Sequence, residues 1–300
     1  MEMLYVADIY AYIALSIISF GIFGNISLIT VTLNTRKFRS NKCCKFAIFQ
    51  ADLRLNLAIL LCLIAICDLT IEIATIRNLI YSLLKIEVHQ NACFYYMILA
   101  DFSLCFQTLL MLSLSVDRLT AIAAPVWYKT VKSTVYFPLF CIPPIIFGTL
   151  LIVFGFVYLE EDRILLICNI PLSVSKPIFC LWNRVSLGLV GLSIAVYIAT
   201  GITIFYKLRR NGSSLQIDFE VMKTITLIVL FYIFTYLFTQ ATDFVLHFVY
   251  TGSSRGPVYT VFVGITAQVG YGGNFYIYMW RNKSYREAFK KLVKCGKASL

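Results

Sequence analysis

The chain alternates between long apolar segments and short polar ones. Each apolar segment is long enough to cross roughly 30 Å of bilayer hydrocarbon as a helix that rises about 1.5 Å per residue. Helices are the expected form, because an open strand edge in lipid would leave backbone groups without hydrogen bonds. The pattern predicts an all-α fold, a seven-transmembrane helix bundle with spans at about residues 9–33, 57–84, 92–123, 135–159, 178–206, 222–250 and 257–280.

The composition supports a membrane protein. Hydrophobic residues make up 60% of the chain and charged residues only 14%, whereas soluble domains carry about 25% charged residues. Residues 1–8 are acidic and lack the basic start of a signal peptide, so we expect the first apolar segment to be a retained span. The predicted organisation is an extracellular N-terminus at 1–8, a seven-transmembrane domain at 9–280, and a cytoplasmic amphipathic helix and tail at 281–300.

The basic residues are unevenly distributed between the two sides of this bundle. Twenty of the 26 Lys and Arg residues fall on the side that holds the tail, and six on the other. Cytoplasmic loops carry the excess of Lys and Arg, so the N-terminus is predicted outside and the C-terminus inside. The same bias accounts for the net charge of +11. We therefore expect the lipid bilayer, and no nucleic acid, as the partner of these charges.

Several classes of protein are disfavoured by what the sequence lacks. Its two histidines, His89 and His247, are far apart, and its ten cysteines show no C-x-x-C pair. This argues against an enzyme with a histidine cluster and against a metal site. An odd number of spans without an internal repeat also disfavours the duplicated halves common in transporters.

Three polar side chains inside apolar segments stand out. They are Asn25, Asp68 and Asn274. Such groups are costly at mid-membrane depth, so all three should face the bundle interior. For Asn25, an equally good interpretation is that its side chain only forms a hydrogen bond between two helices. Asp68 is a functional candidate, because a buried acid can bind a cation or change its protonation state.

An acid and a base lie side by side at the end of the third segment, at Asp117 and Arg118. The distribution of basic residues places this pair at the cytoplasmic boundary. Its simplest interpretation is an ion pair that ends the helix, and its alternative is a switch.

Cysteines on the two sides have different expected chemistry. Cys93 and Cys168 both fall on the outer side, where a disulfide can persist, although unpaired thiols or a competing partner in Cys180 stay open. Cys295 lies among basic residues in the tail and is a candidate for palmitoylation. The stretch before it places Tyr285 and Phe289 on one apolar face, which predicts a helix lying along the inner leaflet.

Taken together, these positions resemble a rhodopsin-like G-protein-coupled receptor. The features are Asn25, Asp68, Cys93 twenty-five residues before Arg118, and Asn274 to Tyr278 in the seventh segment. The Asp-Arg-Leu form of the central triplet, the Ile-Ala-Ala-Pro-Val-Trp-Tyr that follows, and Tyr-Arg-Glu-Ala-Phe near the end are similar to nematode serpentine chemoreceptors of class sx.

The resemblance implies a role for each matching residue. Asp117 would hold Arg118 in the resting state, and Tyr197 and Tyr278 would support the active one. Asp68, Asn274 and Gln107, with Asn25 nearby, would form a mid-membrane cluster able to bind a sodium ion, the one cofactor considered. A Cys93–Cys168 disulfide would tie the outer loop over a ligand cavity.

The sequence also departs from the usual pattern. Phe275 stands where most members have a proline. The sixth span lacks the usual Trp and Pro, and Tyr232 and Tyr236 are candidate replacements for the Trp. The loop after the first span is longer than the loop of the family by about a dozen residues, roughly 44–55. These residues are either a loop extension, which could be a short interfacial helix, or a gene-model artefact.

The resemblance implies a non-enzymatic chemosensory receptor for an environmental small molecule or peptide. It would signal through a heterotrimeric G protein from the plasma membrane, with sensory cilia as one location. Candidate ligand residues are Asp101, Gln240, Asp243 and His247, although Asp101 fits equally well as a structural partner of Arg77 or Arg184. The alternatives are a neuropeptide receptor of the same fold, or a transporter or channel that uses Asp68, Asp101 and Asp243.

Overall fold

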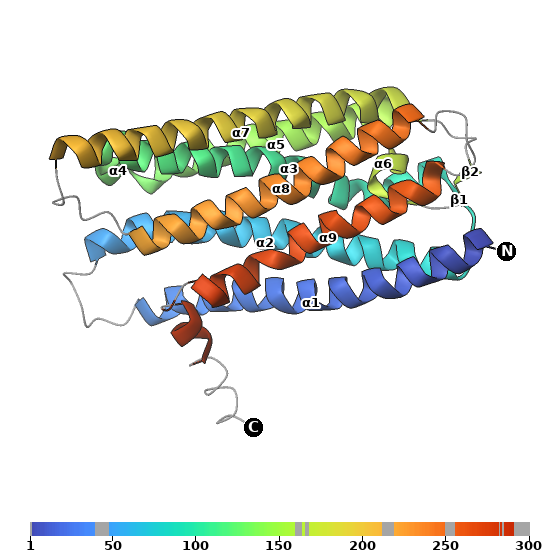
Figure 1. The fold of residues 1–300 in the computed structure, drawn as a ribbon, viewed down its shortest axis with the longest axis horizontal. Helices are drawn as coiled ribbons and strands as arrows, with labels where there is room; N and C mark the ends of the chain where they lie inside the picture. The colour runs from blue at the N-terminus through green and yellow to red at the C-terminus, as the bar shows by residue number, and fades with distance from the viewer. Residues whose placement is uncertain are drawn as a thin grey trace.

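A computed structural model describes most of the backbone. The described residues are 2–39, 48–159, 164–165, 168–211, 219–249, 256–281, 283 and 285–290. Almost all of them are helical, and seven long helices run side by side along the molecule (Figure 1). The predicted all-α fold is confirmed. The long helices are α1 (Glu2–Arg39), α2 (Ile48–Leu83), α3 (Gln90–Ala123), α5 (Ser133–Val157), α7 (Lys176–Asn211), α8 (Phe219–Val249) and α9 (Gly256–Arg281).

Several helices begin earlier than the apolar segments suggest. Helix α1 starts at Glu2 although the span was predicted from about residue 9, and α2 starts at Ile48 rather than near residue 57. At about 1.5 Å per residue, the 38 residues of α1 extend about 57 Å, well beyond the hydrocarbon thickness. Backbone hydrogen bonds continue a helix past its apolar part. Of the questioned stretch 44–55, residues 48–55 belong to α2, and the rest lies outside the described residues.

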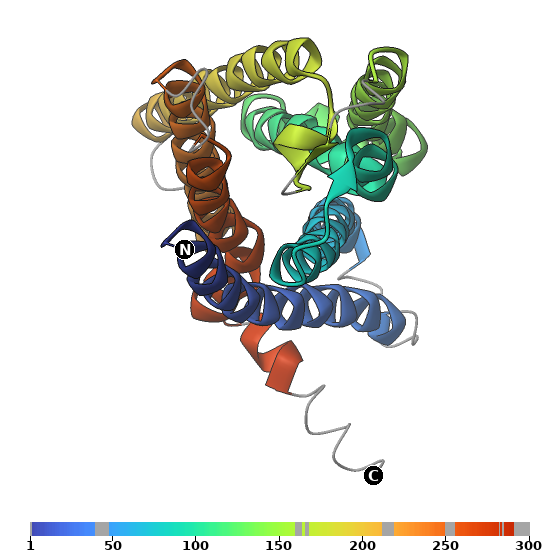
Figure 2. The ribbon, with the colours of Figure 1, turned by 90° about the vertical axis from the view of Figure 1, so that its right-hand side faces the viewer.

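Helix α3 occupies the centre of the bundle. It packs against α2, α5 and α7 and also contacts α6 and α8. In the part of the chain that the structure describes, it is the most deeply buried of the candidate membrane spans. Viewed end-on, the helices surround an interior into which α6 (Ile170–Ser173) projects near one end (Figure 2). A change at one end of α3 can therefore reach the other end through a single rigid element.

The two ends of the bundle carry different small elements. One end has the antiparallel pair β1 (Val88–His89) and β2 (Ile164–Leu165) together with α6, and we call it the disulfide end. The other end has α4 (Pro125–Thr130), which follows α3 directly, and we call it the Asp–Arg end. Residues 285–290 form a further helical turn there, and the Phe289 ring lies 5.4 Å from that of Phe275 in α9.

Helices α1 and α9 approach closely at a pair of glycines. A Cβ on Gly272 would lie 2.9 Å from the Cα of Gly21, so a larger residue would force the helices apart. The Glu72 side chain from α2 occupies the remaining space between them. Small residues allow this kind of close helix contact in membranes.

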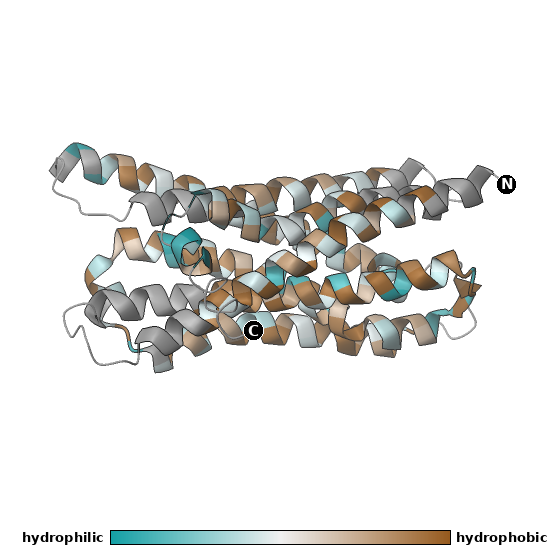
Figure 3. Cartoon of the chain, turned by 90° about the horizontal axis from the view of Figure 1, so that it is seen from below, coloured by the Kyte–Doolittle hydropathy of each residue, from teal (hydrophilic) through white to brown (hydrophobic). Residues whose placement is uncertain are grey.

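The outer surface of the bundle is apolar along much of its length (Figure 3). Large side chains such as Phe20, Leu99 and Phe234 are about two-thirds exposed. Among the described residues, five helices are long and apolar enough to cross a membrane, namely α1, α2, α3, α5 and α7, and α8 contributes a shorter apolar stretch at Val229–Thr242. Such a surface is stable in lipid and would be unfavourable in water.

Candidate functional site

A compact polar cluster closes the Asp–Arg end. Asp117 and Arg118 are buried in the last turns of α3, and Oδ2 of Asp117 accepts hydrogen bonds from Nε of Arg118 at 2.7 Å and from its Nη2. Oδ1 accepts from the hydroxyl of Tyr128 at 2.8 Å and from that of Tyr136 at 2.5 Å. Both carboxylate oxygens are thereby satisfied within the protein. We call these four residues the Asp–Arg cluster.

Three helices bring these four side chains together. Pro125 begins α4 immediately after α3, since a proline at the first helical position needs no hydrogen-bond donor, and the helix places Tyr128 beside Asp117. Burial raises the pKa of the Tyr128 hydroxyl, which keeps its proton and can donate it. The same oxygen accepts from Nη2 of Arg118 at 3.1 Å. Tyr136 comes from α5 and is 1% exposed.

Neither tyrosine was assigned a role from the sequence. The Asp117–Arg118 pair was predicted, but the separation of Tyr136 from it follows no helical spacing, and only tertiary packing brings them together. A second unpredicted contact lies beside the cluster. Nζ of Lys207 in α7 donates to the carbonyl oxygens of Ile122 at 2.5 Å and Ala123 at 3.3 Å. It thus caps the C-terminal end of α3.

The two other predicted switch residues lie near the cluster without joining it. Tyr197 in α7 and Tyr278 in α9 are close enough to Arg118 to interact with its charge. Among the hydrogen bonds of the described residues, none joins either hydroxyl to Arg118. The Tyr278 ring lies 5.3 Å from that of Tyr285.

The predicted mid-membrane cluster divides into two parts. Asp68 accepts from Nε2 of Gln107 at 2.6 Å and from Nδ2 of Asn274 at 3.0 Å. Asn25, which was predicted to lie near this cluster, does not bond to Asp68. It donates instead to Glu72 at 3.1 Å, one helical turn farther along α2, and to the carbonyl oxygen of Tyr271 at 3.3 Å.

Glu72 was not assigned to this cluster from the sequence, because the membrane-spanning part of α2 is apolar on most of its faces and hydropathy does not show which of its few polar residues meet those of other helices. The oxygen donors around Asp68 suit a sodium ion, since the carbonyl oxygens of Gln107 and Asn274 are buried and bond to no group in the described part of the chain. The described residues contain no cluster of three His, Cys, Asp or Glu side chains that would hold a metal ion.

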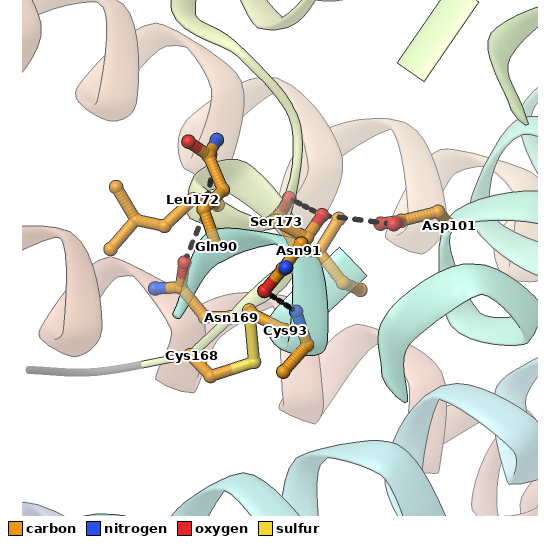
Figure 4. The surroundings of a disulfide bond; sticks show 10 residues. Gln90, Asn91, Cys93, Asp101, Cys168, Asn169, Leu172 and Ser173 are labelled. Atoms are coloured by element: carbon orange, nitrogen blue, oxygen red, sulfur yellow. Dashed lines mark hydrogen bonds between the residues drawn. A yellow bond between two sulfur atoms is a disulfide. The ribbon is translucent and has the colours of Figure 1, made fainter. Parts of the chain in front are cut away.

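A short lid covers the bundle at the disulfide end (Figure 4). Cys93, in the first turn of α3, is bonded to Cys168, and their Cα atoms lie 5.6 Å apart. The Asn169 side chain caps α6 by accepting from the backbone N–H of Leu172 at 3.0 Å. The hydroxyl of Ser173, the last residue of α6, lies 2.9 Å from Oδ2 of Asp101 in α3. The lid, residues 168–173, is thus held covalently at one end and by a polar contact at the other.

Asp101, a predicted ligand residue, contacts the lid in this structure. It is buried and faces Ser173, and it pairs with neither Arg77 nor Arg184, the structural partners considered from the sequence. The Arg77 guanidinium instead lies 3.7 Å from the centroid of the Tyr96 ring.

Beneath the lid lies a cavity of about 100 Å³. Of the predicted ligand residues, Gln240 lines it, while the side chains of Asp243 and His247 lie outside the described part of the structure. Cys295, the predicted palmitoylation site, is also outside it. The lining residues are Ile71, Thr75, Asn78, Leu79, Ser82, Met97, Leu104, Asn169, Ile170, Pro171, Trp182, Thr239, Gln240, Gly264, Ala267, Gln268 and Tyr271.

A comparison of the sequence with models of protein families shows to which family the chain belongs. Residues 18–293 match the family model described as serpentine-type seven-transmembrane GPCR chemoreceptor Srsx. The chain belongs to this family. No curated protein matches the sequence.

Membership in the Srsx family confirms the resemblance inferred from the motifs. It makes the chain a multi-pass membrane protein of a GPCR chemoreceptor family, which is in general not enzymatic. The match covers α1 from residue 18 onward and all of the other six long helices, including α8 and α9.

Proposed function

We propose that this Srsx receptor binds a small molecule at the disulfide end and activates a heterotrimeric G protein at the Asp–Arg end. The observation that carries the proposal is the position of α3. Met97 and Leu104 line the cavity, and Asp117 and Arg118 on the same helix form the closed cluster. Leu104 and Arg118 are fourteen residues apart, which corresponds to about 21 Å along the helix.

The hydrogen bonds of the cluster support its assignment as the resting-state lock. Arg118 faces Asp117 and Tyr128 rather than a partner outside the bundle. Activation would open the cluster and turn Arg118 toward a cavity formed by movement of α8, where the G protein binds. Tyr197 and Tyr278 would then support the open form. A ligand needs to favour that form by only a few kcal/mol to shift the population.

The charges and the disulfide support one orientation in the plasma membrane. Most Lys and Arg residues belong to segments at the Asp–Arg end or the tail, which favours the cytoplasm for that side. The Cys93–Cys168 bond favours an oxidising outer side. Both are consistent with an extracellular N-terminus and a cytoplasmic C-terminus.

A sodium ion is the cofactor that the interior polar groups could accommodate. Asp68, Gln107 and Asn274 would hold it through carboxylate and carbonyl oxygens. Its positive charge would stabilise an ionised Asp68 in the resting state.

The cavity argues against the alternatives. A volume of about 100 Å³ suits a small molecule better than a neuropeptide. A transporter or channel would need Asp68 and Asp101 along an ion path, but Asp68 is engaged by Gln107 and Asn274, and Asp101 by Ser173.

The proposed function is tested by G-protein activation in cells that express the receptor. A panel of small odorants should include at least one that gives a dose-dependent response, and Arg118→Ala should abolish it. Arg184→Ala, which changes an exposed arginine in α7, is the matched control and should respond normally. A full response from Arg118→Ala at equal surface expression would show that Arg118 is not the coupling residue.

A further inference from the structure

The lining of the cavity contains no acidic or basic side chain among the described residues. Nearby charged groups are engaged elsewhere. Asp101 faces Ser173, Arg77 lies over Tyr96, and Glu72 accepts from Asn25. A charged ligand would lose its hydration on entering the cavity and would meet no opposite charge there, which is strongly unfavourable. The described lining therefore selects for an uncharged ligand.

Three carboxamides from three helices contribute to this lining. They are Asn78 of α2, Gln240 of α8 and Gln268 of α9, with exposed fractions of 8%, 3% and 6%. The side-chain carbonyl oxygen of each is buried and has no hydrogen-bond partner among the described residues. Buried carbonyl oxygens normally accept at least one hydrogen bond, and three of them line this cavity against one unpartnered donor, the Trp182 Nε1–H, so the lining favours a ligand that donates.

The orientation of one carboxamide is fixed by its neighbour. The Thr75 hydroxyl donates its single hydrogen to the carbonyl oxygen of Ile71 at 2.8 Å. It can therefore only accept from Gln268, whose Nε2 lies 3.1 Å away. Rotating the amide by 180° would bring two acceptors together. The Gln268 nitrogen is thus committed to Thr75, and its oxygen stays available as an acceptor.

We propose that the ligand is a small, uncharged hydrogen-bond donor, such as a primary amide or an alcohol, recognised by the carbonyl oxygens of Asn78, Gln240 and Gln268. Its apolar part would pack against Ile71, Leu79, Met97 and Leu104 on the same lining. The proposal rests on the cavity being the ligand site of the proposed receptor. A cavity of about 100 Å³ has room for only a few water molecules, so the ligand must be small.

The donor requirement is tested by binding to the purified receptor in nanodiscs. Thermal unfolding is measured with butyramide, 1-butanol, N,N-dimethylbutyramide, butylammonium and butyrate. Butyramide and 1-butanol should raise the unfolding midpoint, because ligands that bind the folded state stabilise it. N,N-dimethylbutyramide keeps the carbonyl but has no N–H, and should give little or no shift, as should the two ions.

Two substitutions test the assigned oxygens. Gln240→Met keeps the length of the side chain and removes the acceptor, and should weaken butyramide binding about five- to tenfold. Gln240→Glu should instead add a response to butylammonium, and this gain requires a folded protein. Asn183→Met is the matched control, because Asn183 also has a buried, unpartnered oxygen but does not line the cavity.

The binding result is independent of G-protein coupling. Equal stabilisation by N,N-dimethylbutyramide, stabilisation by the ions alone, or no stabilisation by either donor would overturn the ligand class while leaving the Arg118 assay unaffected. Failure of the Arg118 assay with donor-selective binding intact would overturn the signalling role alone.

Discussion

The Asp–Arg cluster and the cavity lining, toward opposite ends of α3, differ in how completely their buried polar groups are paired. At the Asp–Arg end, Asp117 accepts four hydrogen bonds from three side chains. At the disulfide end, the carbonyl oxygens of Asn78, Gln240 and Gln268 have no partner among the described residues. A saturated cluster is stable without further contacts, whereas an unsaturated one gains free energy when a donor binds. The difference suggests that the first end is a lock and the second a binding site.

The two ends also differ in how they are fastened. A covalent bond between Cys93 and Cys168 fixes the lid at the disulfide end. The Asp–Arg cluster is held only by hydrogen bonds and an ion pair, which can exchange partners when helices move. We therefore expect the larger movement on activation at the Asp–Arg end.

The largest expected effect on stability comes from removing the disulfide. The bond closes a loop of 75 residues, which corresponds to about 4.5 kcal/mol of unfolding free energy when only chain entropy is considered. Cys168→Ser should lower the unfolding midpoint in nanodiscs and reduce surface expression. Cys141→Ser, which changes a free and partly buried cysteine, is the control. A Cys168→Ser receptor as stable as the control would mean that the lid does not depend on this bond.

The next effect comes from weakening the lock at the opposite end. Asp117→Asn removes the charge that holds Arg118 and should destabilise the resting state by about 3 kcal/mol. Because the open form is then more populated, ligand-independent nucleotide exchange by the G protein should rise strongly. Asp101→Asn changes the other buried aspartate described on α3 and should leave basal exchange unchanged. Equal basal exchange rates in Asp117→Asn and Asp101→Asn would contradict the interpretation that the lock lies at the Asp–Arg end.

The smallest effect is local to the lid. Ser173→Ala removes the contact with Asp101 and should destabilise α6 by about 1 kcal/mol. Hydrogen–deuterium exchange of the Leu172 and Ser173 amides, both bonded to Asn169, should become about fivefold faster. Ser193→Ala removes a hydroxyl that bonds only within α7 and serves as the control. Unchanged exchange would mean that the disulfide and the Asn169 cap alone order the lid.

The sequence predicted the parts of the molecule that depend on composition and on chain order. Seven apolar segments were sufficient to predict a bundle of seven long helices. Asp117 and Arg118 were found because adjacent opposite charges are costly at the end of an apolar helix. Asp68 and Asn274 were found because polar groups are rare inside such segments.

Residues whose importance depends on helix rotation could not be predicted. In a membrane span both faces are apolar, so periodicity does not show which side faces inward. Tyr136 therefore looked like the other aromatic residues of its span. Asn25 and Glu72 meet because Gly21 and Gly272 allow α1 and α9 to approach, a packing detail that hydropathy does not contain. The contact between Asp101 and Ser173 could not be predicted, because the sequence does not specify the path of the segment that carries α6.

The central claim is that the Asp–Arg cluster holds the receptor at rest. It is tested most directly by basal G-protein nucleotide exchange in Tyr136→Phe, which removes one hydroxyl from Asp117 and keeps the ring. Tyr95→Phe is the control, since it removes an exposed hydroxyl at the opposite end of α3. The account predicts that basal exchange rises in Tyr136→Phe alone and is lost again when Arg118→Ala is added. Basal exchange in Tyr136→Phe equal to that of the wild type and the control, at equal surface expression, would contradict it.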